Sequence, residues 1–134
     1  MEKLDITSFE KALNSLKEVI EVYNFDETNL ITRDSMIQRF EYTYSITLKM
    51  IKRYFSQGAF VENIDSMTFN EMVRQANKMD LLKSNLETWT LFREKRNLTS
   101  HTYDEKIATN VVKIIPLFYE EAQFLLNKLK ERLS

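Results

Sequence analysis

The chain has 134 residues, 43% of them hydrophobic, with one glycine, one proline and no cysteine. This length fits a single domain over residues 1–134, and the composition indicates an all-helical protein without disulfide bonds, which suits a reducing cytoplasm. The formal net charge of −1 argues against a protein that binds nucleic acid over its whole surface, because such proteins are usually basic.

Charge is distributed unevenly along the chain. Residues 1–32 carry three lysines and seven acids, whereas residues 33–101 carry eleven bases and eight acids. A surface that faces an anion should therefore lie in the middle of the chain, unless the excess is ordinary scatter of solvated charge. The sequence has no apolar run near 18 residues and no signal peptide at residues 1–5, so we expect a cytoplasmic protein that does not bind a membrane.

The N-terminal part predicts two helices joined by a turn. The first begins near Asp5, a plausible cap, and repeats apolar residues at spacings of four and three. Residues 24–29 contain Asn and Asp, which favour turns. The second helix runs from about Leu30 to Gln57 and should end at Gly58 in a left-handed cap. Basic residues outside its apolar stripe face an anion or, for most of them, water; they are Arg33, Arg39, Lys49, Lys52 and Arg53.

The middle of the chain predicts an irregular stretch followed by two shorter helices. Residues 58–68 should cross one end of the bundle, and Ser66 or Thr68 then caps the third helix. A fourth helix over about residues 84–98 carries Arg93 and Arg96 beside core positions. We expect Trp89 of this helix in the core, with an edge contact to a ligand or partner as the alternative.

The last helix is predicted to be long. Its apolar positions keep one phase on both sides of Pro116, whereas a turn would normally reset that phase. We therefore expect one helix, kinked at Pro116, because proline removes a backbone hydrogen bond without necessarily ending the helix.

The only histidine, His101, follows Arg96 by five residues and precedes Tyr103 by two. Side chains five residues apart in one helix diverge by roughly 140°, so Arg96 and His101 converge only if the helix ends between them. A histidine near neutral pH can move protons, and an arginine can bind phosphate. The alternative is a histidine that only caps a helix or lies on the surface.

The residues around His101 predict the required helix end. Thr99 and Ser100 bond to local backbone and are poor helix-interior residues, while Thr102 with Glu105 forms a predicted capping box. One helix should end near residue 98 and the next should begin near Thr102. His101 would then precede a helix N-terminus, where exposed N–H groups favour a phosphate, and Tyr103 would lie, exposed to solvent, in the first turn.

The segment from Arg96 to Tyr103 resembles the Arg-x4-His-x-Tyr signature of the HEPN superfamily, with the polar Asn97 after the arginine. Over nearly its full length the chain also resembles the nucleotidyltransferase substrate-binding protein family of that superfamily, in its HepT-like form. Three blocks carry this resemblance, residues 33–41, 73–76 and 89–104, and the third is the most specific. Met67 stands where many members have a proline.

The resemblance implies an up-and-down four-helix bundle with a short extra helix, which pairs as a homodimer and binds a separate minimal nucleotidyltransferase chain. HepT-like relatives include toxins of toxin–antitoxin pairs, in which Arg and His form a metal-independent ribonuclease site at the dimer interface. The antitoxin transferase silences that site by attaching AMP to the Tyr. Matched by position, these residues are Arg96, His101 and Tyr103, with Asn97 in a supporting role. No metal or other cofactor is implied.

The chemistry of RNA cleavage is consistent with this resemblance. Without a metal, the reaction needs a base for the 2′-hydroxyl, an acid for the leaving oxygen and a cation for the phosphate. One His and one Arg cannot fill three roles, but two copies across a twofold axis can. Tyr103 lies on the same side as His101 if that segment is extended, so AMP on Tyr103 would block the cleft. Further candidate contacts to substrate or partner are Arg39, Trp89 and Arg93.

Two other functions remain open at the level of sequence. One is a non-catalytic subunit that presents nucleotide or substrate to a transferase, and the other is a structural bundle that only binds a partner. A ribonuclease and a binding subunit would keep the same motif. The chain is not expected to be the transferase itself, because that chemistry needs a Gly-Ser pair followed by spaced carboxylates, and the only glycine precedes Ala59.

Overall fold

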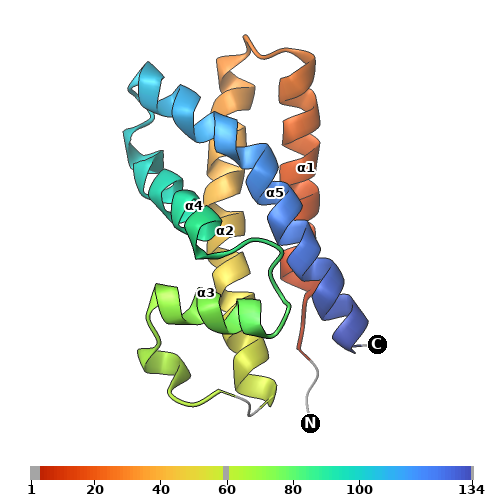
Figure 1. Ribbon diagram of the computed structural model, residues 1–134. Coiled ribbons are helices and arrows are strands. Elements are labelled where there is room, and N and C mark those ends of the chain that lie inside the picture. Colours follow the sequence, from red (N-terminus) through yellow and green to blue (C-terminus); the bar gives the residue numbers. More distant parts are fainter. Residues whose placement is uncertain (1–3, 59–60, 134) are drawn as a thin grey trace.

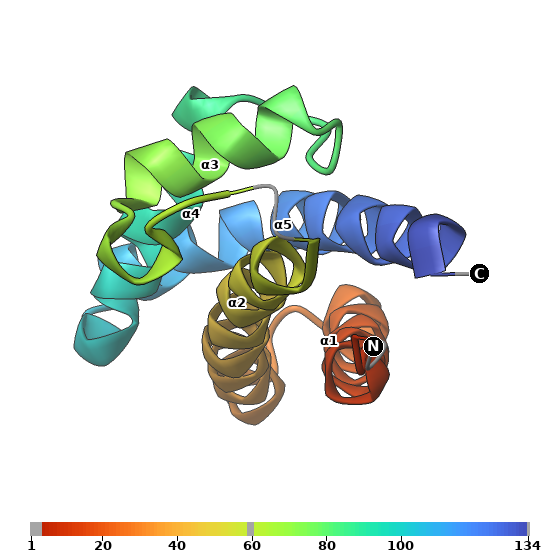
Figure 2. The ribbon, with the colours of Figure 1, turned by 90° about the horizontal axis from the view of Figure 1, so that it is seen from below.

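The computed structural model describes residues 4–58 and 61–133, and these residues form helices and loops without a β-strand. The elements are α1 (Thr7–Phe25), α2 (Leu30–Gly58), the 3-10 turn η1 (Ile64–Ser66), α3 (Phe69–Lys78), α4 (Leu86–Leu98), the 3-10 turn η2 (Thr99–His101) and α5 (Glu105–Leu133). Helices α1, α2, α4 and α5 run up and down as a bundle (Figure 1), and Figure 2 shows α3 on the side away from α1. The expected all-α four-helix bundle with a short extra helix is confirmed.

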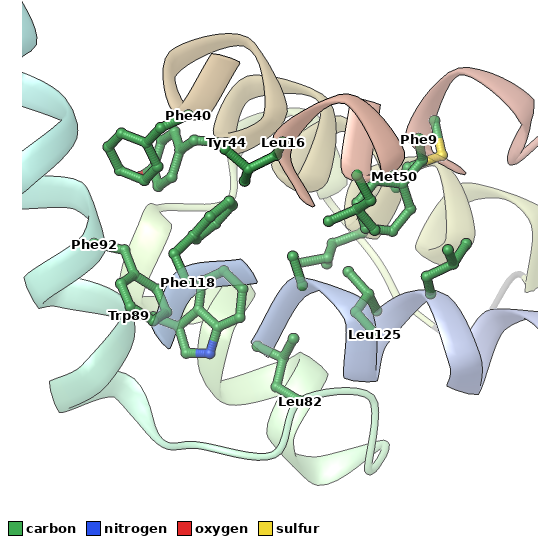
Figure 3. Close-up of a cluster of buried hydrophobic side chains, with 14 of the residues drawn as sticks. Phe9, Leu16, Phe40, Tyr44, Met50, Leu82, Trp89, Phe92, Phe118 and Leu125 are labelled. Atoms are coloured by element: carbon green, nitrogen blue, oxygen red, sulfur yellow. The ribbon is translucent and has the colours of Figure 1, made fainter. Parts of the chain in front are cut away.

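An aromatic cluster within the core gathers on Phe118 of α5, whose ring packs against aromatic residues of α2 and α4 (Figure 3). The centroid of its ring lies 5.1 Å from that of Phe40 and 5.3 Å from that of Phe92, in edge-to-face contacts that aromatic pairs favour. Trp89 packs at 6.3 Å from Phe118 and is 0% exposed, so its predicted place in the core is confirmed. Burial raises the pKa of the Tyr44 hydroxyl, at the edge of this cluster, to about 12.

The helix ends follow local sequence signals at most positions. Helix α1 begins at Thr7 with Ile6 at the N-cap position, one residue after the predicted cap Asp5. The Asp5 carboxylate still accepts a hydrogen bond from the Thr7 N–H (2.9 Å), and this bond lowers the pKa of the carboxyl. Thr68 and Glu71 form a reciprocal capping box at the start of α3, so Thr68 is the cap of the predicted pair. Helix α5 continues through Pro116, as its unbroken apolar phase predicts.

The predicted left-handed cap at Gly58 is wrong. Gly58 is the last residue of α2, and the described residues include no glycine with a positive φ. The left-handed positions are instead Asn63 (φ 58°), before η1, and Asp80 (φ 57°), after α3. Asparagine and aspartate tolerate this conformation because their side chains bond locally, so neither turn needs a glycine. Residues 59 and 60, within the stretch predicted to cross the bundle end, lie outside the described residues.

Among the described residues, no helix is both long enough and apolar enough to cross a membrane.

Candidate functional site

The segment from Arg96 to Tyr103 forms the junction between α4 and α5. Helix α4 ends at Leu98 as predicted, and the chain then continues through the 3-10 turn η2 rather than becoming extended. This turn separates Arg96, in the last turn of α4, from His101 at the end of η2. The predicted interruption between the two residues is therefore present.

The predicted cap at Thr102 is wrong, and Asp104 caps α5 instead. The Asp104 carboxylate accepts hydrogen bonds from the N–H groups of Lys106 (2.9 Å) and Ile107 (3.3 Å). Thr102 has φ −77° and ψ 2°, whereas a capping threonine needs an extended backbone, and its hydroxyl donates to the Thr99 carbonyl (3.3 Å). Tyr103 consequently lies before α5 and not in its first turn.

The guanidinium of Arg96 is held at the boundary between α2 and α4. Its Nη1 donates to the hydroxyl of Thr99 (3.2 Å) and lies 3.7 Å from the Glu41 carboxylate of α2. Thr99 is buried, and its hydroxyl in turn donates to the carbonyl of Arg96 (2.7 Å). About a third of the Arg96 side chain remains exposed, so this cation is oriented by protein contacts yet accessible to a ligand.

Arg96 lines one end of a hollow that we call the α2–α4 groove. Its volume is about 460 Å³, and its lining residues come mainly from α2; they are Gln38, Glu41, Tyr42, Ser45, Ile46, Lys49 and Arg96. The volume lies within the usual range for a site that binds a small molecule. The groove combines two cations with one carboxylate and several hydroxyl and amide groups, a mixture suited to a polar ligand.

His101 and Tyr103 lie together on the exposed side of the junction. Their rings are 6.2 Å apart at 75°, in an edge-to-face contact. Tyr103 is 84% exposed, which confirms its predicted accessibility. In the described part of the chain, no hydrogen bond joins the His101 ring to Arg96. A single chain therefore pairs His101 with Tyr103 and turns Arg96 towards α2.

The other candidate contacts have partners within the bundle. Arg39 donates to the Ser15 carbonyl (2.8 Å), and the Arg93 guanidinium lies 5.0 Å from the centroid of the Phe69 ring. Trp89 is fully buried, so its side chain has no exposed surface that a ligand could contact. The residues that the structure describes include no group of three His, Cys, Asp or Glu side chains that could hold a metal ion.

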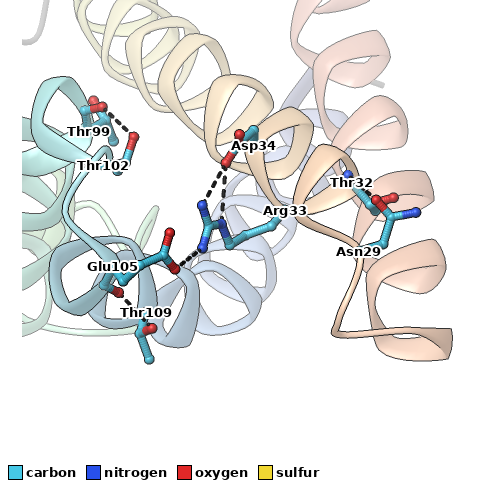
Figure 4. A network of polar contacts seen from close by, with 8 residues as sticks. All are labelled: Asn29, Thr32, Arg33, Asp34, Thr99, Thr102, Glu105 and Thr109. Carbon is cyan, nitrogen blue, oxygen red and sulfur yellow. Dashed lines mark hydrogen bonds and ion pairs between the residues drawn. The ribbon is translucent and has the colours of Figure 1, made fainter.

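The prediction that Arg33 faces water or an anion is wrong. Arg33 is only 8% exposed; its Nη1 lies 2.6 Å from the Glu105 carboxylate of α5, and its Nε and Nη2 each lie 3.2 Å from Asp34 (Figure 4). The hydrogen bond with Glu105 is the main reason that the pKa of Arg33 is raised. A sequence signal existed, because Arg33 precedes the buried Met36 and Ile37 by three and four residues and so lies on their face of α2.

We call Arg33, Asp34 and Glu105 the Arg33 ion-pair cluster. Glu105 follows Tyr103 by two residues, and Arg33 lies in the first turn of α2. The cluster therefore fastens the start of α2 to the start of α5, next to the exposed His101 and Tyr103. It also explains why Glu105 does not complete a capping box with Thr102, since its carboxylate is bound to Arg33.

The chain is similar to known proteins over almost its whole length. The family model described as "Nucleotidyltransferase substrate binding protein like" matches residues 4–131. A protein of Haemophilus influenzae named "Probable ribonuclease HepT" is 34% identical over 140 residues, which cover 98% of this chain and 95% of that protein.

Two solved structures share the fold. One, from Haemophilus influenzae, is described as revealing the fold of a substrate binding domain of a nucleotidyltransferase. It has a TM-score of 0.86 and 30% identity, over 94% of this chain and 99% of that one. The other is a crystal structure from Thermus thermophilus, with a TM-score of 0.74 and 29% identity, over 90% of this chain and 98% of that one.

Proposed function

This chain belongs to the nucleotidyltransferase substrate binding protein-like family, and on that basis we propose that it acts with a separate minimal nucleotidyltransferase chain. In this proposal it is a metal-independent ribonuclease, the toxin half of a toxin–antitoxin pair in the cytoplasm, and the transferase silences it by attaching AMP to Tyr103. The observation that carries the proposal is the α4–α5 junction, where an oriented Arg96, an exposed His101 and an exposed Tyr103 lie within eight residues. The similarity to a protein named as a ribonuclease supports it.

The cleavage step assigns roles to Arg96 and His101. A neutral His101 takes the proton from a ribose 2′-hydroxyl, and the 2′-oxygen forms a bond to the adjacent phosphorus. The bond from phosphorus to the 5′-oxygen breaks, and a protonated His101 donates a proton to that oxygen. Arg96 stabilises the negative charge that builds up on the phosphate oxygens.

The site is completed by a second copy of the chain. One His101 cannot be neutral and protonated at once, so the base and the acid come from two copies. The exposed position of His101 and the opening of the α2–α4 groove next to Arg96 support a homodimer in which α2 and α4 approach the twofold axis. Asn97, directly after Arg96, contributes a polar side chain to this site.

The silencing step is adenylylation of Tyr103. The Tyr103 oxygen attacks the α-phosphorus of ATP, the tyrosine proton is lost, and the bond to pyrophosphate breaks. The transferase supplies the catalytic groups, while this chain supplies an acceptor that is 84% exposed and whose ring packs on His101. AMP added there would cover His101 and add a negative charge that repels RNA.

A second function, a non-catalytic subunit that binds nucleotide or substrate for the transferase, is favoured by one observation. The α2–α4 groove has the volume and polar lining of a small-molecule site, and the similar Haemophilus influenzae structure is described as a substrate binding domain.

One experiment distinguishes the two functions. The chain is expressed with and without the nucleotidyltransferase of the neighbouring reading frame, and the purified protein is incubated with RNA in EDTA. A ribonuclease arrests growth only without its partner and cleaves RNA in EDTA. A protein that does neither, yet binds nucleotide in the α2–α4 groove, is the binding subunit.

A further inference from the structure

Four large apolar side chains are exposed together where α1 turns into α2. They form a surface that we call the apolar tip, made of Val22 (53% exposed), Phe25 (94%), Leu30 (53%) and Ile31 (84%). The other large apolar side chains exposed among the described residues are Tyr42, Tyr103 and Leu117, which belong to three separate places in the chain. Single exposed apolar residues are common on proteins, whereas a cluster on adjoining turns marks an interaction surface.

The turn beneath the apolar tip is well fixed. The Asp26 carboxylate accepts hydrogen bonds from the N–H (3.0 Å) and the hydroxyl (2.5 Å) of Thr28, and these bonds lower the pKa of Asp26. The Asn29 side chain accepts a hydrogen bond from the Thr32 N–H (3.1 Å) and so caps α2. Phe25 and Leu30 therefore project from an ordered frame, which lowers the entropic cost of binding a partner.

A small hollow lies beside the apolar tip, between α1 and α2. Its volume is about 250 Å³, and its lining combines apolar, hydroxyl and charged groups; the residues are Glu18, Val19, Val22, Ile31, Thr32, Ser35 and Arg39. This volume suits one large side chain of a partner. Val22 and Ile31 belong to both the hollow and the apolar tip, so the two form one continuous surface.

The rim of the apolar tip is acidic. Residues 18–32 contain four exposed acids, Glu18, Glu21, Asp26 and Glu27, and no lysine or arginine. Arg39, which lines the hollow, donates a hydrogen bond to a backbone carbonyl of α1. Two copies that met tip to tip would bring these acids together, and such like-charge contacts are costly. The rim instead fits a different protein whose apolar pocket is bordered by Lys or Arg.

The apolar tip lies at the same end of the molecule as Tyr103. Figure 1 shows the α1–α2 turn and the α4–α5 junction at one end of the bundle. The Arg33 ion-pair cluster helps to hold the two places in position relative to each other, because Arg33 is bound to Glu105 (Figure 4). Arg33 follows Ile31 by two residues, and Glu105 follows Tyr103 by two. A protein seated on the apolar tip is thus held at the end that presents Tyr103.

We propose that the apolar tip is the docking surface for the nucleotidyltransferase chain, which covers it with an apolar pocket bordered by basic residues. This inference rests on the proposed function, since it names the surface through which the transferase is held while it modifies Tyr103. The apolar side chains supply affinity, and the acidic rim selects the partner and speeds its association.

The test measures binding of the full-length chain to the transferase of the neighbouring reading frame by calorimetry. The double variant Phe25→Ser/Ile31→Ser should raise Kd by about ten-fold or more, because it removes the two most exposed anchors. The single variant Glu21→Lys should raise Kd less, and its effect should shrink as salt is added. Leu117→Ser, an exposed apolar residue on α5, is the matched control and should bind as the wild type does.

A second readout follows AMP addition to Tyr103 by intact mass. The double variant should need more transferase for half-maximal modification and should reach the wild-type yield at saturating transferase, because docking changes while the acceptor does not. Circular dichroism should show unchanged helicity, since both substituted side chains are exposed.

The outcomes separate the inference from the proposed function. If the wild type does not bind the transferase, the proposed function fails and the inference fails with it. If the wild type binds and the double variant binds equally well, only the inference is overturned. If light scattering shows that the double variant alone changes from dimer to monomer, the apolar tip joins two copies of this chain and the inference is again overturned.

Discussion

At the scale of single residues, Arg96 and His101 have different surroundings and should differ in what they contribute to stability. The His101 side chain makes a ring contact with Tyr103, whereas the Arg96 side chain contacts Thr99 and Glu41. We predict that His101→Ala and Arg96→Ala each abolish RNA cleavage in EDTA and growth arrest. The cost in unfolding free energy should stay within about 0.5 kcal/mol for His101→Ala and about 1 kcal/mol for Arg96→Ala.

The control for these variants is Arg74→Ala, which removes an exposed arginine of α3, far from the α4–α5 junction along the chain. Urea unfolding measures the unfolding free energy of each variant, and a gel assay on the same preparations measures RNA cleavage. If His101→Ala cleaved RNA as fast as the wild type, the proposed role of His101 in proton transfer would be contradicted.

Tyr103 is the proposed acceptor of AMP because it is the most exposed tyrosine of the described chain. Incubation with the partner transferase, ATP and Mg²⁺ should add about 329 Da for each AMP, and Tyr103→Phe should abolish the addition. Intact mass measures the change, and Tyr42→Phe, which removes the hydroxyl of another exposed tyrosine, is the control. An addition that persists in Tyr103→Phe would assign the modification to a different residue.

A helix cap could be predicted from sequence where its side chains bond only to neighbouring residues in the chain. Thr68 was one of the two predicted caps, and the side chains of Thr68 and Glu71 each accept a hydrogen bond from the other residue's backbone N–H. The same pattern at Thr102 and Glu105 failed, since Glu105 is bound to Arg33, 72 residues away. A capping pattern shows that two residues can bond to each other, while tertiary contacts decide whether they do.

At the scale of helices, the Arg33 ion-pair cluster holds α2 against α5. Arg33→Met keeps most of the apolar stem of the side chain but removes its hydrogen bonds to Glu105 and Asp34, both of which are largely exposed. We expect a loss of about 1–2 kcal/mol in unfolding free energy, because hydrogen bonds to charged groups contribute about this much. Arg74→Met is the matched control and should change stability by less than about 0.5 kcal/mol. Equal urea midpoints for the two variants would contradict the role of the cluster.

Glu121 of α5 is an unusual member of the core. It is 1% exposed, and its Oε1 has no hydrogen-bond partner among the described residues. A buried carboxylate without full hydrogen bonding is costly, so we predict that Glu121→Met raises the unfolding free energy by about 1 kcal/mol. Thermal unfolding followed by circular dichroism measures this change. A lower melting temperature than that of the wild type would contradict this prediction.

The helix positions themselves were largely predictable, because each long helix has its own apolar stripe. Helix α5 shows the strength of this signal, since its apolar phase correctly carried the helix through Pro116. The end of α2 shows its limit. The glycine at residue 58 suggested a left-handed cap, but the left-handed positions are Asn63 and Asp80, and no stripe or spacing indicates which loop residue adopts that conformation.

At the scale of the whole molecule, the proposed active site needs two copies. We predict a homodimer, so light scattering at micromolar concentration should give twice the 16.0 kDa of one chain. Dilution below the dissociation constant should lower the ribonuclease activity per chain. A strictly monomeric protein that cleaves RNA at every concentration would contradict the two-copy site.

How the helices pair was only partly predictable. The resemblance implied the four-helix bundle, and the structure confirms it. The position of Arg96 at the α2–α4 groove depends on Glu41, 55 positions earlier in the chain, and such a contact leaves no local pattern. The apolar tip was not predicted. Its residues are apolar like the buried residues of α1 and α2, and the sequence does not show that the turn between the two helices leaves these side chains exposed.

The Arg33 ion-pair cluster also bears on the order of events in folding. Helices α1 and α2 adjoin in sequence, as do α4 and α5, so each pair closes through short loops, whereas the bond from Arg33 to Glu105 spans 72 residues. Contacts between distant segments form late on the folding pathway. The cluster should therefore contribute little to the folding rate and act mainly by slowing unfolding. The bond from Arg33 to Glu105 should accordingly form after the helices within each pair have packed together.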